Sequence, residues 1–216
     1  MRVIAGRAKG KRLFGAPGMR TRPATDRVKK SVFDILAPRI VGTRCLDLFA
    51  GTGALGIEAL SRGACLAVFV ECDARMVAAI RRNLEETSLS GQARVVHGDV
   101  RWAVRVLAGK EESFDLVFLD PPYGHGLAPL ALELVARHGL ARQDGIIVAR
   151  HERRQEMPGH GANVKLVRQE RFGGTVVSFY RVTGASGEDG PRVDGGGPAD
   201  GGVVPGPGDD GRVGGD

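Results

Sequence analysis

The sequence predicts an α/β domain with a seven-stranded, mostly parallel sheet, helices on both faces and a C-terminal antiparallel hairpin. Two observations carry this prediction. From Thr43 onward, short apolar runs alternate with amphipathic runs of helical spacing, which is typical of a parallel sheet covered by helices. At the end of that region, two β-like runs, Val164–Phe172 and Thr175–Val182, are joined by Gly173-Gly174, which indicates a hairpin.

The first element is an N-terminal arm, residues 1–42, which begins with a short hairpin. In it, Arg2-Val3-Ile4 and Arg12-Leu13-Phe14 flank a turn rich in Gly and Lys. A helix follows, with Thr25 as its N-cap, and its apolar side chains recur at helical spacing. We expect that apolar face to dock on the body and the basic side chains to point mostly outward. The apolar set is Val28, Val32, Phe33, Leu36 and Ile40, and the basic set is Arg27, Lys29 and Lys30.

The body, residues 43–183, supplies the rest of the sheet and its helices. Besides the hairpin, the predicted strands are Cys45–Phe49, Leu66–Glu71, Arg94–His97, Phe114–Asp120 and Ile146–Ala149. The predicted helices are Ala54–Arg62, Ala74–Glu86, Val100–Ala108 and Leu127–Arg137.

Charge is distributed unevenly along the chain, whose net charge is +6. Residues 1–44 hold twelve Lys or Arg against two Asp, whereas residues 184–216 hold two Arg against seven Asp or Glu. A basic arm is typical of polyanion binding, although a charged surface can also be merely solvated. The candidate nucleic-acid contacts in the arm are Arg2, Arg7, Lys9, Lys11, Arg12, Arg20, Arg22 and Arg27.

Composition also sets limits on the class of protein. Residues 184–216 are mostly Gly, Pro and Asp, so we expect a disordered acidic tail. No apolar run is long enough to span a membrane or to direct secretion, which predicts a cytoplasmic protein. Cys45, Cys65 and Cys72 form no CxxC or Cys/His cluster, so we expect buried reduced thiols, without zinc or disulfides.

The first motif with chemical content runs from Asp47 to Gly56, where the first strand of the body ends. Gly51 and Gly53 allow a tight turn before a helix, and ligands of open α/β sheets bind at such strand ends. With Glu71 about twenty residues on, the motif also fits a dinucleotide fingerprint. Asp47 favours a methionine ammonium over a pyrophosphate, unless it only caps local N–H groups.

Two further carboxylates are candidates for cofactor binding. Glu71, at the end of the second strand, can accept both ribose hydroxyls, or be an ordinary acid at a helix N-terminus. Asp99 can accept an adenine amino group or act as a helix N-cap. The full set of candidate cofactor-binding residues is Asp47, Phe49, Ala50, Gly51, Gly53, Glu71, Cys72, Asp99 and Val100.

The decisive motif is Asp120-Pro121-Pro122-Tyr123, after the apolar strand that begins at Phe114. Two prolines stiffen the loop and remove two N–H donors, so the loop offers a carboxylate and bare carbonyl oxygens. Such a loop accepts hydrogen bonds from an exocyclic amine and directs the nitrogen lone pair toward an electrophile. Tyr123 can stack on a flipped base. The four residues are therefore the candidate catalytic set.

The sequence assigns no definite functional role to five other residues. Trp102 lies on an apolar helical face and is expected in the core rather than as a stacking platform. Arg150, His151, Arg153 and Arg154 follow the fifth strand. They either contact nucleic-acid phosphates or are simply solvated.

The layout, the proline motif and the arm each resemble known protein families. The layout resembles the Rossmann-like class I methyltransferases, and the proline motif resembles the catalytic motif of amino methyltransferases acting on nucleic-acid bases. The arm, through Arg2–Gly6 and Arg22–Val28, together with Asp47–Glu58 resembles the bacterial 16S rRNA guanine-N2 methyltransferase family that modifies guanine 966. The likeness covers about residues 1–182. Ala24, where a hydroxyl residue is expected, and the acidic tail depart from the family pattern.

The resemblance implies an S-adenosylmethionine-dependent rRNA methyltransferase. It assigns Asp47, Gly51, Gly53, Glu71 and Asp99 to the cofactor and Asp120 to Tyr123 to catalysis. The implied reaction is direct methyl transfer to the N2 amine of a guanine in small-subunit rRNA, without a metal. The arm would grip the RNA, free or in an assembled 30S particle. The residues alone identify neither the base nor its position.

Three alternatives remain open at this point. An adenine-N6 DNA methyltransferase uses the same amine chemistry, but a large sequence-reading domain does not fit in this chain. A nucleotide-binding redox or regulatory protein could use the glycine loop alone. A catalytically silent RNA-binding assembly factor could keep the arm without turnover.

Overall fold

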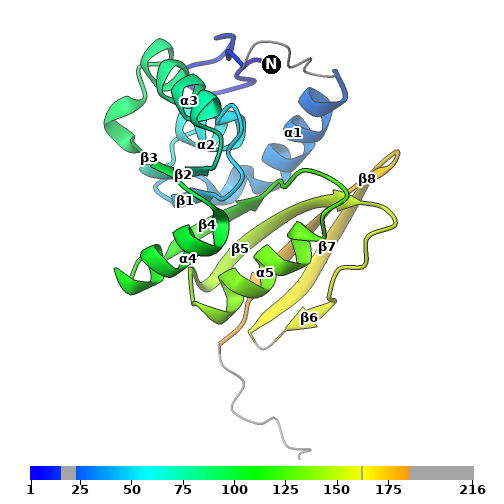
Figure 1. Cartoon of the computed structure of the whole chain (residues 1–216). Coiled ribbons are helices and arrows are strands. Elements are labelled where there is room, and N and C mark those ends of the chain that lie inside the picture. Colours follow the sequence, from blue (N-terminus) through cyan, green and yellow to red (C-terminus); the bar gives the residue numbers. More distant parts are fainter. Residues whose placement is uncertain (16–22, 162, 185–216) are drawn as a thin grey trace, which may run out of the picture. The chain divides into compact units, whose positions relative to one another are not determined.

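An eight-stranded sheet organises the part of the chain that the computed structural model describes, residues 1–15, 23–161 and 163–184 (Figure 1). The strand order is β3-β2-β1-β4-β5-β8-β7-β6. The first five strands are parallel, and β8, β7 and β6 continue the sheet in antiparallel fashion. The strands are β1 Arg44–Asp47, β2 Leu66–Glu71, β3 Ala93–His97, β4 Phe114–Leu119, β5 Ala141–Glu152, β6 His160–Gly161, β7 Val164–Phe172 and β8 Thr175–Val182.

The predicted fold class is confirmed, with one strand more than expected. The additional strand is β6, two residues that pair with Val164 and Lys165. A run of two residues is too short to show any alternation, so no sequence pattern predicts this strand. Strand β5 also begins five residues before the predicted Ile146. The sequence did not reveal this first part because it contains three exposed polar residues, which interrupt the apolar run.

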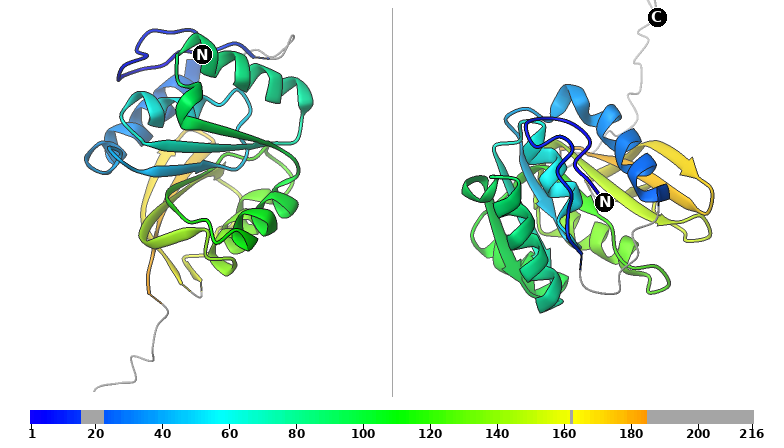
Figure 2. Two further views of the ribbon diagram at one scale, coloured as in Figure 1. Left: turned by 90° about the vertical axis from the view of Figure 1, so that its left-hand side faces the viewer. Right: turned by 90° about the horizontal axis from the view of Figure 1, so that it is seen from above.

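The helices form a layer on each face of the sheet (Figures 1 and 2). One face carries α1 Pro23–Leu36, α2 Ala54–Ser61 and α3 Ala74–Glu86, and the other carries α4 Val100–Gly109 and α5 Leu127–Arg137. Short 3-10 turns lie at Ala37–Arg39 and Ser90–Gln92. Each layer buries its own apolar cluster against the sheet.

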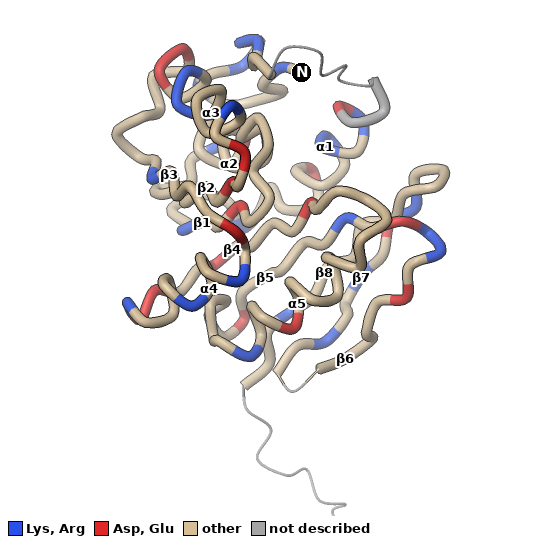
Figure 3. Tube along the Cα trace, viewed as in Figure 1, with Lys and Arg blue, Asp and Glu red and all other residues tan. Residues whose placement is uncertain are grey.

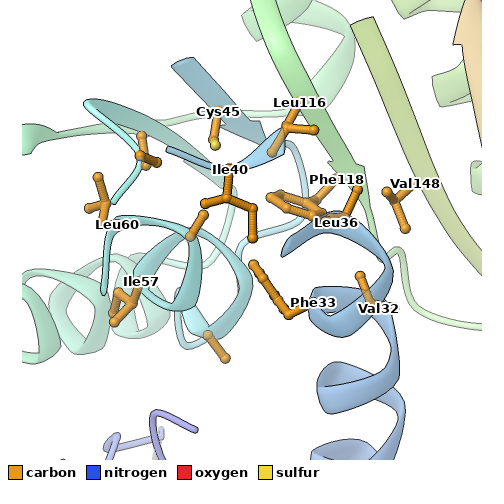
Figure 4. Packing of buried hydrophobic residues seen from close by; sticks show 14 of the residues in the cluster. Val32, Phe33, Leu36, Ile40, Cys45, Ile57, Leu60, Leu116, Phe118 and Val148 are labelled. Carbon is orange, nitrogen blue, oxygen red and sulfur yellow. The ribbon is translucent and has the colours of Figure 1, made fainter. Parts of the chain in front are cut away.

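Helix α1 completes the larger of the two clusters. Figure 4 shows Phe33 of α1 beside Phe118 of β4, and their ring centroids lie 5.7 Å apart. The expected apolar face of the helix is confirmed, since Val28, Val32, Phe33, Leu36 and Ile40 are all buried. The helix begins at Pro23, two residues before the predicted cap Thr25, because proline suits the first helical turn.

The arm folds back on itself and docks on α2. Arg2 and Arg12 form an antiparallel bridge, which confirms the predicted hairpin. Glu58, a fully buried residue of α2, accepts the backbone N–H groups of Ile4 at 2.8 Å and Ala5 at 3.0 Å. These bonds tie the arm to the helix that follows the glycine loop.

Lys29 was expected to face outward, and that prediction is wrong. The side chain is buried, with its Nζ 3.2 Å from Glu58 Oε2 and 2.7 Å from the Arg2 carbonyl oxygen. Burial lowers the pKa of Lys29, and the Glu58 carboxylate opposes that shift. A carboxylate this deeply buried requires a cation, which the sequence pattern of one helix alone does not reveal.

Three further expectations need comment. Trp102 is 50% exposed, so the prediction of a core tryptophan is wrong, because its helix turns that position toward solvent. All three cysteines are free, as predicted, but only Cys45 is buried, since Cys65 and Cys72 lie at strand ends. Arg20, Arg22 and the predicted tail from residue 185 onward lie outside the described residues. Within the described ranges, no helix is long and apolar enough to cross a membrane.

Candidate active site

The candidate residues gather at one edge of the sheet. Because β1 to β5 are parallel, their carboxyl ends share an edge, where β1 ends at Asp47, β2 at Glu71 and β4 just before Asp120. Asp47 lies in register with Phe69 on one side and Phe118 on the other. The topology therefore brings together side chains that are up to 73 residues apart in the sequence.

The glycine loop joins β1 to α2 as predicted. Gly51 and Gly53 have φ of +53° and +76°, a region that residues with a side chain rarely adopt. The Gly51 N–H donates to Glu71 Oε2 at 2.8 Å, and the Asp73 N–H donates to Glu71 Oε1 at 2.8 Å. Glu71 thus holds the loop in place and keeps further lone pairs on both oxygens.

Asp47 is a buried carboxylate with half of its hydrogen-bonding capacity unused. Oδ2 accepts the Gly56 N–H at 3.1 Å, whereas Oδ1 is buried without a partner. Burial raises the pKa of Asp47 to about 7, with smaller contributions from the charges of Asp120 and Glu71. The capping alternative therefore accounts for only one of the two oxygens, and the other suits a cationic group.

The remaining candidate cofactor residues line the same edge. Asp99 caps α4 by accepting the Arg101 N–H at 2.8 Å, so the capping role considered for it is present. Cys72 is exposed beside Glu71, and its carbonyl oxygen lies 3.0 Å from His97 Nε2. The other three side chains line the interior, with Phe49 half-buried and Ala50 and Val100 buried.

The proline loop begins with a carboxylate held by an arginine. Arg150 Nε lies 2.8 Å from Asp120 Oδ1, as an ion pair without the alignment of a hydrogen bond. Burial raises the pKa of Asp120, and the Arg150 charge opposes that shift. Pro121 is buried and Pro122 exposed, which anchors the loop on one side only.

Tyr123 is held from two directions. Its hydroxyl lies 2.7 Å from Thr175 Oγ1, and the Arg150 guanidinium carbon lies 5.6 Å from the ring centroid. Tyr123 remains 39% exposed, so part of the residue is accessible to a ligand. Arg150, which the sequence left between a phosphate contact and a solvated residue, instead links the two polar members of the proline loop.

A small pocket of about 60 Å³ lies between the start of α2 and the start of the proline loop. Ala54 and Leu55 line it from the glycine-loop side, and Leu119 and Asp120 line it from the proline loop. Val28 and Val32 of α1 close it, together with apolar residues of β5 and β8. The residues that follow the glycine loop and the first residue of the proline loop therefore border the same pocket.

Asn83 of α3 connects the arm to the glycine loop. Its side-chain nitrogen donates to the carbonyl oxygens of Thr52 and Phe14, both at 2.9 Å. Its side-chain oxygen accepts the Phe14 N–H at 2.8 Å, and the residue is fully buried. One amide thus fixes two segments that lie 38 residues apart in the sequence.

Replacing this amide is expected to be costly. In Asn83→Leu, the buried backbone groups of Phe14 and Thr52 lose their partners, so the free energy of unfolding should fall by about 3 kcal/mol. Asn163→Leu is the matched control, because the Asn163 side chain makes a single bond, to the Ala136 carbonyl oxygen. Chemical denaturation of both variants measures the difference. Equal losses would show that the bridge stabilises the fold no more than a single hydrogen bond does, and would contradict the prediction.

Glu58, Asn83 and Arg150 are the site-supporting residues that sequence reasoning missed. Glu58 stands in an otherwise apolar stretch of α2, and Asn83 lies on the buried side of α3, so a polar residue on an apolar face was the available signal. No sequence signal pairs Arg150 with Asp120, because that contact depends on how β4 and β5 align.

Known proteins resemble this chain in sequence. The profile of a family described as conserved hypothetical protein 95 matches residues 1–181. A putative rRNA methyltransferase of Bacillus subtilis, YlbH, is 40% identical over 184 residues, 85% of this chain and 100% of the relative. Ribosomal RNA small subunit methyltransferase D of Escherichia coli is 37% identical over 183 residues, 84% of this chain and 89% of the relative.

The chain belongs to this methyltransferase family. Among solved structures, a putative methyltransferase of Escherichia coli, yhhF, has a TM-score of 0.72 at 34% identity, covering 85% of this chain and 98% of the other. The family resemblance inferred from the arm and the proline motif is thereby confirmed. The match includes the arm, so the arm is a family feature and not an addition of this chain.

Proposed function

We propose that the chain transfers a methyl group from S-adenosylmethionine to the N2 amine of a guanine in small-subunit ribosomal RNA. The observation that carries the proposal is the closeness of the two carboxylates: Asp47, with its buried free oxygen, lies in register with Phe118, two residues before Asp120, and the Asp120 charge contributes to the raised pKa of Asp47. The relatives named as rRNA methyltransferases support RNA as the substrate class.

The residues present fit this cofactor. The unpartnered Asp47 Oδ1 suits the ammonium of the methionine part, since a buried carboxylate oxygen gains most from a cationic donor. Glu71 retains lone pairs for ribose hydroxyls, and Asp99 retains one oxygen beside its cap for an adenine amine. A dinucleotide pyrophosphate would instead face the Asp47 carboxylate and be repelled.

The proline loop then orients the acceptor amine. The Asp120 carboxylate and the Pro121 carbonyl oxygen accept the two N–H bonds of a guanine N2 amine, which turns the nitrogen lone pair toward the glycine loop. S-adenosylmethionine, which Asp47, Glu71 and Asp99 would hold, would supply an electrophilic sulfonium methyl group to this amine, and its sulfur would leave as a neutral thioether. Because the proton leaves after transfer, Asp120 acts as a hydrogen-bond acceptor rather than as a strong base.

The target base must leave its stack to reach the pocket. Tyr123 is partly exposed in the same loop as Asp120 and contacts Thr175 and Arg150, so we infer that it stacks on the flipped guanine. The exposed arm residues Arg2, Arg7, Lys9, Lys11, Arg12 and Arg27 are the proposed RNA contacts of the arm. The Arg7 guanidinium also contacts Gln92.

Radiolabelled methyl transfer tests the proposal. Small subunits and total RNA from cells lacking the enzyme are incubated with the full chain and labelled S-adenosylmethionine, and the RNA is digested to nucleosides. We expect the label in N2-methylguanosine of small-subunit RNA. Label in N6-methyladenosine, label only in added DNA, or no transfer at all would each refute the assignment. Calorimetry with S-adenosylhomocysteine and with NAD separates the redox alternative, which requires binding of NAD alone.

A further inference from the structure

We infer that a groove beside the proline loop holds the RNA strand next to the target guanine, with Arg153 and Arg154 as its phosphate contacts. The inference rests on the proposed function. The groove, about 1090 Å³, is lined by Tyr123, by Glu152–Arg154 at the end of β5 and by the turn Gly173–Thr175 before β8. Since β8 is antiparallel to β5, this turn lies at the same edge of the sheet as the candidate active site.

The groove carries a net positive charge, because two arginines and one carboxylate, Glu152, line it. Arg153 and Arg154 are exposed, and within the described residues neither guanidinium has an ion pair or hydrogen bond. Some other exposed arginines are paired, as Arg75 is with Asp73 at 2.7 Å and Arg168 with Glu170 at 2.8 Å, whereas others, such as Arg101 and Arg105, resemble Arg153 and Arg154. Free guanidinium groups that line a concave surface favour an anion with several oxygens, such as a phosphodiester.

The groove is structurally continuous with the catalytic loop. Tyr123 lines it and is bonded through its hydroxyl to Thr175 at 2.7 Å. The Arg153 N–H donates to the Gly174 carbonyl oxygen at 2.9 Å, which joins the segment after β5 to the turn before β8. A nucleotide adjacent to a base stacked on Tyr123 would therefore enter this groove first.

The composition of the groove favours a single-stranded nucleic acid. An aromatic ring next to two free guanidinium groups matches the pairing of base stacking and phosphate contact that such strands require. Figure 3 shows Lys and Arg both along the N-terminal arm and in the segment between β5 and β6. The arm docks on α2 and α3, on the other side of β4, so the two basic surfaces flank the candidate active site.

Salt-dependent RNA binding tests the inference. The probes are a 16S rRNA transcript and purified small subunits, and the variant is Arg153→Ala/Arg154→Ala. We expect affinity for both probes to fall about tenfold or more and the slope of log K against log salt to become shallower by about 1.4, the value for two lost phosphate contacts on a single strand. Affinity for S-adenosylhomocysteine should stay unchanged.

Two further variants make the result specific. Lys110→Ala/Arg137→Ala removes two exposed charges at the helix ends on the opposite edge, and it should leave the slope unchanged. Arg153→Lys/Arg154→Lys keeps the charge and should restore most of the slope. An unchanged slope in the alanine variant, while Lys9→Ala/Lys11→Ala weakens binding, would overturn the groove but leave the proposed function intact.

Two other outcomes would overturn the inference. If the alanine variant loses affinity for small subunits but keeps its affinity and slope with the naked transcript, the groove binds a ribosomal protein, and the inference is wrong. If the wild-type chain binds neither probe and transfers no methyl group, the proposed function fails, and the groove fails with it.

Discussion

Asp120→Ala is expected to reduce turnover by about 10³-fold while affinity for S-adenosylhomocysteine changes less than about threefold. The variant removes the carboxylate that accepts the amine, and loss of one group that stabilises developing charge costs roughly this factor in other enzymes. The cofactor side is spared because Asp47 and Glu71 lie on other strands. Single-turnover transfer from labelled cofactor to small subunits measures the rate.

Asp120→Asn distinguishes acceptor from base. An amide oxygen still accepts a hydrogen bond, so this variant should keep transfer within about thirtyfold of wild type, although it loses the charge that pairs with Arg150. An amide cannot take up the proton, so a general base at this position would not tolerate replacement by asparagine. If the asparagine variant is as inactive as the alanine variant, Asp120 removes a proton in the rate-limiting step, and the acceptor mechanism is wrong.

Asp47→Asn should separate cofactor affinity from stability. The variant keeps an oxygen for the Gly56 N–H but has no negative charge for the ammonium, so affinity for S-adenosylhomocysteine at pH 8 should fall roughly 30- to 150-fold. Fluorescence of Trp102, the only tryptophan of the chain, reports binding, because it packs on Gly98, next to Asp99. Unchanged affinity would remove Asp47 from the cofactor site.

The same residue predicts a dependence on pH. With a folded-state pKa of about 7, ligand-free Asp47 must lose a proton before it pairs with a cation. Affinity should therefore rise about tenfold per unit of pH below 7 and level off above it. Asp47→Asn should remove this dependence, which titration at several pH values measures.

Stability without ligand should change in the opposite sense. The folded-state pKa of Asp47 lies above the ordinary aspartate value of 3.8, so the folded chain holds an extra proton between about pH 4 and pH 7. The free energy of unfolding therefore decreases as pH rises through that window and stays low above it. At pH 8, Asp47→Asn lacks the buried charge and should melt about 2–4 °C higher than wild type, the shift that a gain of about 1 kcal/mol in the free energy of unfolding produces in a chain of this size.

The sequence predicted those parts of the fold and site that follow from local pattern. The runs Leu66–Glu71, Ala74–Glu86 and Leu127–Arg137 match the observed elements residue for residue, because each has a clear period and a clear end. The position of the glycine loop and the proline loop at one edge of the sheet followed from one rule, that the carboxyl ends of parallel strands meet. No alignment of individual side chains was needed for either.

What the sequence could not show depends on contacts between distant segments. Lys29 has the pattern of an outward residue, and only the docking of the arm on Glu58 explains its burial. Trp102 belongs by spacing to an apolar face, yet the helix turns it to solvent at 50% exposure. Likewise, the pairing of Arg150 with Asp120 and the amide bridge of Asn83 exist only once the elements are packed.

A crystal structure with S-adenosylhomocysteine tests the central claim most directly. We expect the ligand ammonium at about 3 Å from the Asp47 oxygen that now lacks a partner, and the sulfur facing the Asp120 carboxylate. A ligand bound away from the glycine loop, or one whose sulfur is turned from Asp120, would contradict it, because no amine held by the proline loop could then reach the methyl group.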